Sequence, residues 1–212
     1  MNNIFEPLTL SRGSHEAGSG KGCAMNLVSW ENGDTTITDY PACSDRMLSQ
    51  IVQVVNDRLA DSDGRLSAAN SIIALDLGHA TVGTTAHTLT AVELQVVYVR
   101  CAVLAARKVL HLDETGEALG WIEAAERWAD DPIDANKPAA AYAYATYSAY
   151  ASAAYAAYAA SATYSATYSA SDYKVSLAWE VIDLFKKLTG TESPTPNPEA
   201  VATAVTKMFT HA

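Results

Sequence analysis

Apolar residues recur every three or four positions along most of the chain, which is the spacing of one face of an α-helix. In residues 44–59, for example, Met47, Ile51 and Val55 fall on the same face. Sustained alternation of apolar and polar residues, which is typical of a half-buried strand, does not occur between residues 22 and 138. The pattern therefore predicts an all-α fold, a helical bundle.

Capping residues and glycines set the limits of the individual helices. The predicted helical segments are residues 23–32, 44–59, 66–77, 91–110, 118–128, 173–188 and 200–209. Within 118–128 we expect Ile122 and either Trp121 or Trp128 to face inward. Residues 1–21 show little periodicity and predict an irregular N-terminal arm.

Residues 139–171 contain only Ala, Ser, Thr and Tyr. The tyrosines occupy both odd and even positions, which argues against a strand. The alanines favour a helix. Burial of the many tyrosine rings would stabilise an ordered structure, which argues against disorder. This segment is therefore predicted to form one long Ala/Tyr-rich helix.

The length of 212 residues suits a single helical domain. We divide it into a His/Cys-bearing N-terminal part (residues 1–88) and an Ala/Tyr-rich helical bundle (residues 89–212). No apolar run reaches the ~18 residues of a membrane span, and the first residues lack the pattern of a secretory signal. We therefore expect a cytoplasmic protein with no membrane partner.

The net charge of −10 argues against a nucleic-acid-binding protein, because phosphate recognition needs a basic face. Much of the acidic excess lies between residues 113 and 134, where Arg127 is the only base. The acids are Asp113, Glu114, Glu117, Glu123, Glu126, Asp130, Asp131 and Asp134. Such a segment is either a solvated helix face or a patch that meets a basic protein partner.

Four residues of the N-terminal part could carry chemistry: His15, Cys23, Asp39 and Cys43. Cys23 follows Lys21 and Gly22 at the predicted start of a helix, where a cation and the helix dipole would lower the thiol pKa. Cys43 precedes the next predicted helix. If the two helix starts lie side by side, these four side chains would form a tetrahedral site for structural zinc.

Two other interpretations of these residues stay open. Cys23 could act as a catalytic nucleophile, with His15 as base and Asp39 as the group that orients it. Alternatively, the same residues only pack, cap helices and form hydrogen bonds. His79 and His87 bracket a Gly/Thr-rich segment, which we interpret as a loop.

The runs GSH, GCAMN and TDYPACSDRMLSQIVQVVND resemble the opening of an uncharacterised family found in actinobacteria and their phages. The resemblance covers residues 12–57. The matching positions are Gly13, Ser14, His15, Gly22, Cys23, Met25, Asp39, Pro41, Cys43, Asn56 and Asp57. Asn26 stands where the family pattern has Glu, and Tyr40 where it has His, so an acid–base role of those positions would be lost here.

A second resemblance rests on RCAVLAARKVL, IEAAERW and the alanine run that follows, which look like Ala-rich helical immunity proteins of bacterial toxin systems. Neither resemblance supplies a known reaction. We expect a non-enzymatic binding or protein-interaction protein, of the accessory kind found in phages and mobile elements, which binds a protein partner or forms a homo-oligomer. An enzyme that uses Cys23, His15 and Asp39, and a helical protein that binds a small ligand, are the alternatives.

Overall fold

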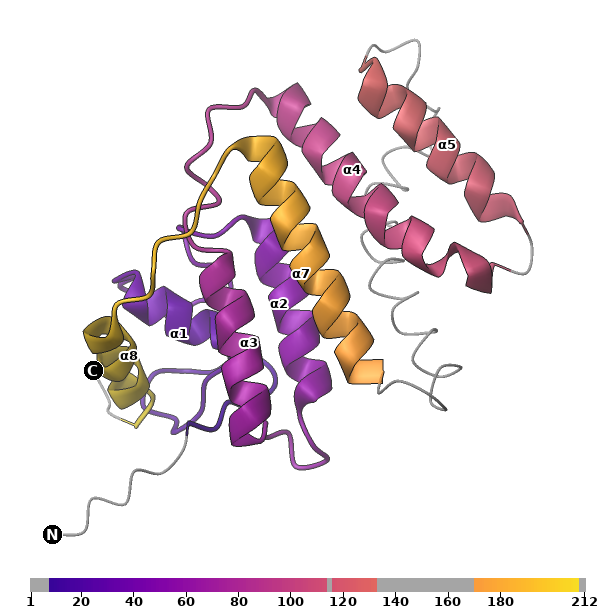
Figure 1. Ribbon diagram of the computed structural model, residues 1–212. Coiled ribbons are helices and arrows are strands. Elements are labelled where there is room, and N and C mark those ends of the chain that lie inside the picture. The colour runs from indigo at the N-terminus through magenta and orange to yellow at the C-terminus, as the bar shows by residue number, and fades with distance from the viewer. Residues whose placement is uncertain (1–7, 114–115, 133–169, 210–212) are drawn as a thin grey trace, which may run out of the picture. The chain divides into compact units, whose positions relative to one another are not determined.

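The computed structural model describes residues 8–113, 116–132 and 170–209, and in these ranges it confirms the all-α fold class (Figure 1). Seven α-helices and one short 3₁₀ helix (Leu110–Leu112) occur in these ranges, with isolated β-bridges but no strand. The α-helices are α1 (Ala24–Glu31), α2 (Arg46–Leu59), α3 (Ala68–Ala80), α4 (Ala91–Val109), α5 (Glu117–Asp130), α7 (Ala170–Thr189) and α8 (Pro198–Phe209).

Most helix limits agree with the sequence prediction because local signals set them. Asp45 caps α2 by accepting hydrogen bonds from the backbone N–H groups of Met47 and Leu48. Thr90 caps α4 in the same way, and Glu93 completes a reciprocal capping box. The predicted helix over residues 139–171 lies almost wholly outside the described residues.

The described residues form two compact units that do not follow the order of the chain. Unit 1 combines residues 1–86 with residues 191–212, and unit 2 is residues 87–190. The first boundary lies close to the expected division at residue 88. The C-terminal segment belongs to unit 1, however, which the sequence pattern does not indicate because the contacts join opposite ends of the chain.

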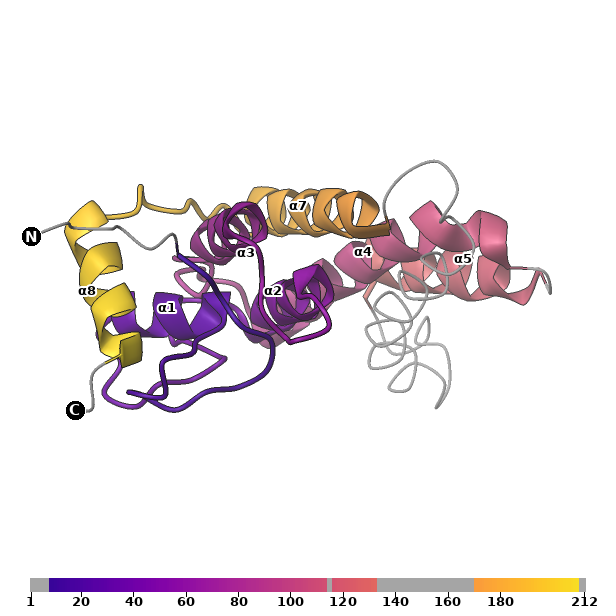
Figure 2. The same cartoon turned by 90° about the horizontal axis from the view of Figure 1, so that it is seen from below.

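Helix α1 is the centre of unit 1, and every residue from Ala24 to Trp30 is buried. It contacts α2, α3 and α8, and Figure 2 shows α8 crossing beside it. Glycine permits two of these approaches. A Cβ atom at Gly78 of α3 would lie 3.1 Å from Val28, and one at Gly22 would lie 3.3 Å from Met208 of α8.

Polar side chains are also buried in unit 1, and they are hydrogen-bonded. Ser44 donates to the Thr81 hydroxyl over 2.6 Å, and the backbone N–H of Asp45 donates to Thr84 over 2.8 Å. These bonds join the start of α2 to the turn that follows α3. Since an unpaired buried polar group is costly, this network fixes how the two segments meet.

In unit 2, α4 lies between α5 and α7, and it contacts both (Figure 1). Val99, Trp128 and Ala129 form the apolar contact between α4 and α5. On the other side of α4, the rings of Tyr98 and Phe185 stack with centroids 6.3 Å apart. The inward positions of Ile122 and Trp128 are confirmed, whereas Trp121 is exposed.

Among the described helices, none is both long enough and apolar enough to cross a membrane.

Candidate functional site

The N-terminal arm is part of the fold of unit 1 from residue 10 onward. Leu10 is fully buried, and its backbone N–H donates to the Ser71 hydroxyl of α3 over 2.9 Å. The backbone of Ser11 then pairs with Gly22, and that of Arg12 pairs with Gly64. The arm therefore runs past the starts of the helices that carry the candidate residues.

Asp39 is the hub of the candidate site. Its Oδ1 accepts a hydrogen bond from Asn26 Nδ2 over 2.8 Å and one from Cys23 Sγ over 3.6 Å. Its Oδ2 accepts a hydrogen bond from the Ser14 hydroxyl. We call Ser14, Cys23, Asn26 and Asp39 the Asp39 cluster. It joins the arm, the start of α1 and the loop before α2.

Asn26 fixes the start of α1 as well as the position of Asp39. Its Oδ1 accepts a hydrogen bond from the backbone N–H of Cys23 over 3.2 Å, which closes a capping arrangement at the first turn. Gln53 of α2 holds the loop from the other side, because its Nε2 donates to the Asp39 backbone carbonyl over 2.8 Å. The start of α1 and the arm thus hold the carboxylate of Asp39, and α2 holds its backbone carbonyl.

The expectation that the pKa of Cys23 is lowered is wrong. Cys23 is 2% exposed, and burial raises the pKa of its thiol to about 12; the charge of Asp39 adds to this increase. The backbone N–H groups of Asn26 and Met25 act in the opposite direction but are outweighed. With its pKa raised in this way, Cys23 is a neutral thiol at neutral pH and donates a hydrogen bond to Asp39.

His15 does not complete a catalytic triad in this arrangement. Its Nε2 atom is buried and has no hydrogen-bond partner. Ser14, its neighbour, is the residue of the arm that donates to Asp39. Of the three candidate catalytic residues, the structure joins only Cys23 and Asp39 by a hydrogen bond.

Cys43 lies in different surroundings from Cys23. It is partly buried, and burial raises the pKa of its thiol to about 11, with further contributions from the charges of Asp34 and Glu31. It is not the cap of α2, because that position belongs to Asp45. In the part of the chain that the structure describes, no three His, Cys, Asp or Glu side chains are grouped to hold a metal ion. Of the four residues expected to bind zinc, Cys23 and Asp39 are hydrogen-bonded to each other, but they form no such group with His15 and Cys43.

Asn56 and Asp57 of α2 add further hydrogen bonds between the arm, the start of α1 and α2. Asn56 is fully buried; its Oδ1 accepts from the Ala24 backbone N–H over 3.2 Å, and its Nδ2 donates to the Ser11 carbonyl over 3.0 Å. Asp57 accepts from the Gly13 backbone N–H over 2.9 Å. Several residues of the N-terminal motif therefore lie close together at the start of α1. Their hydrogen bonds hold the arm against α1 and α2.

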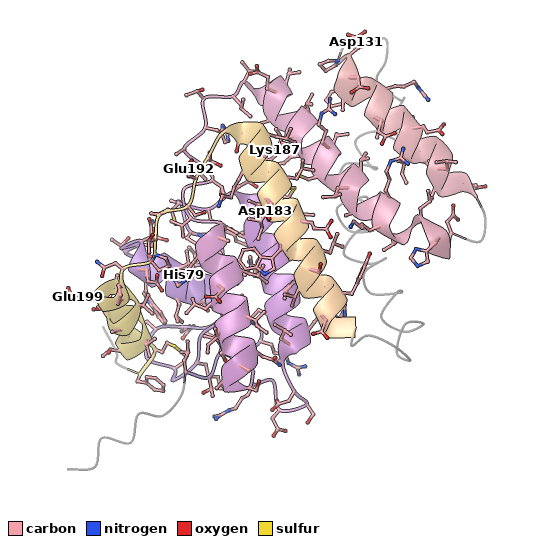
Figure 3. All side chains as sticks on the ribbon, in the orientation of Figure 1. His79, Asp131, Asp183, Lys187, Glu192 and Glu199 are labelled. Atoms are coloured by element: carbon pink, nitrogen blue, oxygen red, sulfur yellow. The ribbon has the colours of Figure 1, made fainter. Side chains whose placement is uncertain are left out.

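His79 belongs to α3 and not to the loop predicted for it (Figure 3). Its Nε2 lies 2.8 Å from Glu31 Oε2, and both side chains are only 12% exposed. The pair joins the last turns of α1 and α3. The sequence pattern gave no sign of this contact because the partners lie far apart in the chain.

The acidic segment of unit 2 is partly neutralised within the molecule. Arg107 of α4 forms two hydrogen bonds of 2.6 Å with Glu126 of α5, and Arg100 lies 2.9 Å from Asp130. The carboxylate of Asp113 caps the first turn of α5 by accepting from the Ala118 backbone N–H. Glu126, Asp130 and Asp113 therefore have structural partners, which favours the solvated-face interpretation for that part of the segment.

The first two turns of α5 present an exposed surface of another kind. The side chain of Trp121 is 56% exposed and that of Leu119 is 41% exposed. Gly120 lies between them, and a Cβ atom placed there would meet nothing within 4 Å. Glu117 and Glu123 are exposed on the same two turns. We call these five residues, Glu117, Leu119, Gly120, Trp121 and Glu123, the α5 surface.

Comparison with models of protein families found no match, and neither curated proteins nor solved structures gave one. The two resemblances that the sequence motifs suggest therefore stay predictions.

Proposed function

We propose that this chain is a non-enzymatic protein-binding protein and that the α5 surface is its binding site. The observation that carries the proposal is the exposure of Trp121. A tryptophan has a large apolar area that water disfavours, and tryptophans are enriched among the residues that dominate protein interfaces. The other tryptophan of the same helix, Trp128, is buried against α4.

The shape of the α5 surface supports the same function. Residues two apart on a helix point to different sides, so Leu119 and Trp121 flank Gly120. Because Gly120 has no side chain, a partner that contacts Trp121 can approach the helix backbone there. Glycine within a helix costs up to about 1 kcal/mol relative to alanine, which is consistent with a role of Gly120 other than stability.

The catalytic alternative has less support. A buried thiol with a raised pKa is a poor nucleophile, and His15 forms no hydrogen bond with Cys23 or Asp39. The small-ligand alternative depends on tyrosines of residues 139–171, which lie outside the described residues. A role as an accessory protein of a phage or mobile element rests on the sequence resemblance. It does not indicate which residues bind a partner.

Selection from a phage-displayed library of random peptides tests the proposal directly. The full-length protein is the bait, and the selected peptides are then measured against variants. We expect peptides whose binding is lost in Trp121→Ala and in Gly120→Gln. The second variant fills the gap between the two apolar side chains while improving helix propensity, so unfolding cannot explain its effect.

Ile72→Ala is the matched control, because Ile72 is 57% exposed but lies on α3 in unit 1. This variant should bind the selected peptides as well as the wild type does. Peptides that bind Trp121→Ala and the wild type equally would refute the α5 surface as the binding site. Thermal unfolding of each variant, followed by circular dichroism, verifies that the fold is intact.

A further inference from the structure

We infer that residues 193–198 form a second binding surface, which fits a protein domain whose groove is lined by aromatic side chains and has basic residues at its ends. These residues read Ser-Pro-Thr-Pro-Asn-Pro, and we call them the proline segment. The proline segment belongs to unit 1 and ends with the first residue of α8. It shares no residue with the α5 surface, so the inference is independent of the proposed function.

The sequence of the proline segment restricts its backbone to an extended form. Every residue in it is either a proline or the residue before one. The proline ring fixes φ at about −65°, and its Cδ atom disfavours the helical region for the preceding residue. The conformation that satisfies both restrictions is polyproline II. In agreement, residues 191–197 form no helix, strand or turn, and Figure 1 shows them as an extended connection that leads into α8.

Both ends of the proline segment are fixed to unit 1. The hydroxyl of Ser193 donates a hydrogen bond of 2.6 Å to the backbone carbonyl of Ala80. A Cβ atom at Gly83 would lie only 2.7 Å from the carbonyl oxygen of Glu192, so a glycine is needed where the chain passes the turn after α3. At the other end, Asn197 Oδ1 accepts a hydrogen bond of 2.9 Å from a backbone N–H in the first turn of α8. The residues between these anchors are therefore held extended before a partner binds.

The middle of the proline segment offers the groups that an aromatic groove recognises. Residues 194–198 are all exposed. Among the described residues, no backbone N–H donates to the carbonyl oxygens of Pro194, Thr195 or Pro196. Proline rings pack against aromatic rings, and a Trp N–H or Tyr O–H of a groove can donate to such carbonyls. Because the bound conformation already exists, binding costs little conformational entropy.

Two acids flank the proline segment and indicate the charge of the groove. Glu192 lies just before the segment and Glu199 just after it, and both are exposed, as Figure 3 shows. An extended chain of this length spans about 20 Å, so a groove that covers it comes close to a carboxylate at each end. Basic residues at the ends of the groove favour this contact, whereas acidic ones oppose it.

An array of purified SH3, WW and EVH1 domains, whose grooves are lined by aromatic residues, tests the inference with the full-length protein. We expect the protein to bind at least one domain, and its affinity to fall about tenfold or more in the variant Pro194→Ala/Pro196→Ala. The control is Pro132→Ala, which removes an exposed proline of unit 2 and should leave the affinity unchanged. Both anchors remain in the double variant, and thermal unfolding verifies that its fold is intact.

A second pair of variants tests the charge of the groove. Glu192→Gln/Glu199→Gln should weaken binding to the same domain about threefold and make it less sensitive to NaCl. The control is Glu16→Gln/Asp76→Asn, which removes two other exposed acids of unit 1. It changes the net charge by the same amount, and its affinity should stay close to that of the wild type.

The outcomes separate this inference from the proposed function. If no domain of the array binds, or if Pro194→Ala/Pro196→Ala binds as well as the wild type, the inference is overturned and the proline segment is only a stiff connection. Equal losses in the two charge variants would overturn the assignment of basic residues to the groove. Trp121→Ala should bind the domains as the wild type does, since the α5 surface takes no part. A loss of domain binding in that variant would also overturn the inference.

Discussion

The two units of the molecule are stabilised in different ways. In unit 1 the centre of the core contains hydrogen-bonded polar side chains, among them Asn26, Asn56 and Ser49, which are buried with the apolar residues of α1 and α2. In unit 2 the described core is apolar. Its ion pairs lie on the surface, as Arg107 with Glu126 and Lys108 with Glu180 show.

This difference indicates where in the molecule a substitution leaves the fold intact. A buried hydrogen bond requires both of its partners, so substitutions in the core of unit 1 leave unsatisfied groups behind. Exposed ion pairs contribute little, and their loss is compensated by water. We therefore expect surface substitutions in unit 2 to be tolerated better than core substitutions in unit 1.

The strongest test of this comparison is Asn56→Ala. The substitution leaves the backbone N–H of Ala24 and the carbonyl of Ser11 without their buried partner. We expect a loss of ~3 kcal/mol in the free energy of unfolding, measured with urea. The control is Asn32→Ala, which removes an exposed hydrogen bond to Asp34. If the two variants cost the same, buried hydrogen bonds do not distinguish unit 1.

A smaller effect is expected from the ionisation of Cys23 at high pH. The unfolded thiol ionises near pH 9.0, whereas the folded thiol has a pKa of about 12. Between these values the unfolded state releases a proton that the folded state retains. Stability is therefore unaffected below pH 9 and falls as the pH rises from 9 towards 12.

Urea unfolding at pH 8 and pH 10 measures this effect. The wild type should lose ~1 kcal/mol more between the two pH values than Cys23→Ser, whose hydroxyl does not titrate in this range. An identical pH dependence of the two proteins would show that the folded thiol ionises as readily as the unfolded one. Iodoacetamide at pH 8 should modify Cys23 only after unfolding.

The smallest effect is expected from Arg107→Ala in unit 2. The side chains of Arg107 and Glu126 are 44% and 37% exposed, so water screens their attraction. The urea midpoint of this variant should differ little from that of the wild type, and the difference should vanish at high salt. A loss as large as that of Asn56→Ala would contradict the comparison between the units. Glu126→Gln tests the same pair from its other side.

The helices could be predicted from the sequence where local signals define them. Gly33, with its positive φ of 81°, follows α1 where the sequence places a stop, and Asp45 begins α2 where a capping residue was expected. The prediction of which α2 residues are buried is only partly correct. Met47 and Val55 are buried, but so is Val52, because both α1 and α3 cover this helix.

The candidate site could be predicted only in part. The motif indicated that Cys23 and Asp39 belong together, and the structure joins them. The lowered pKa predicted for Cys23 was wrong, because its burial depends on α1 lying at the centre of unit 1, which the local sequence does not show. Nor did it distinguish Trp121 from Trp128, since periodicity alone does not show which side of α5 meets α4.

The division of unit 1 between both ends of the chain has a consequence for protein synthesis. On the ribosome, α1 emerges before unit 2, but α8, which contacts α1, emerges only after the whole of unit 2 has been made. Until then the side of α1 that contacts α8 is not covered by that helix. A nascent chain interrupted before Pro198 would expose this surface, and it is therefore a natural substrate for chaperones and for quality-control proteases.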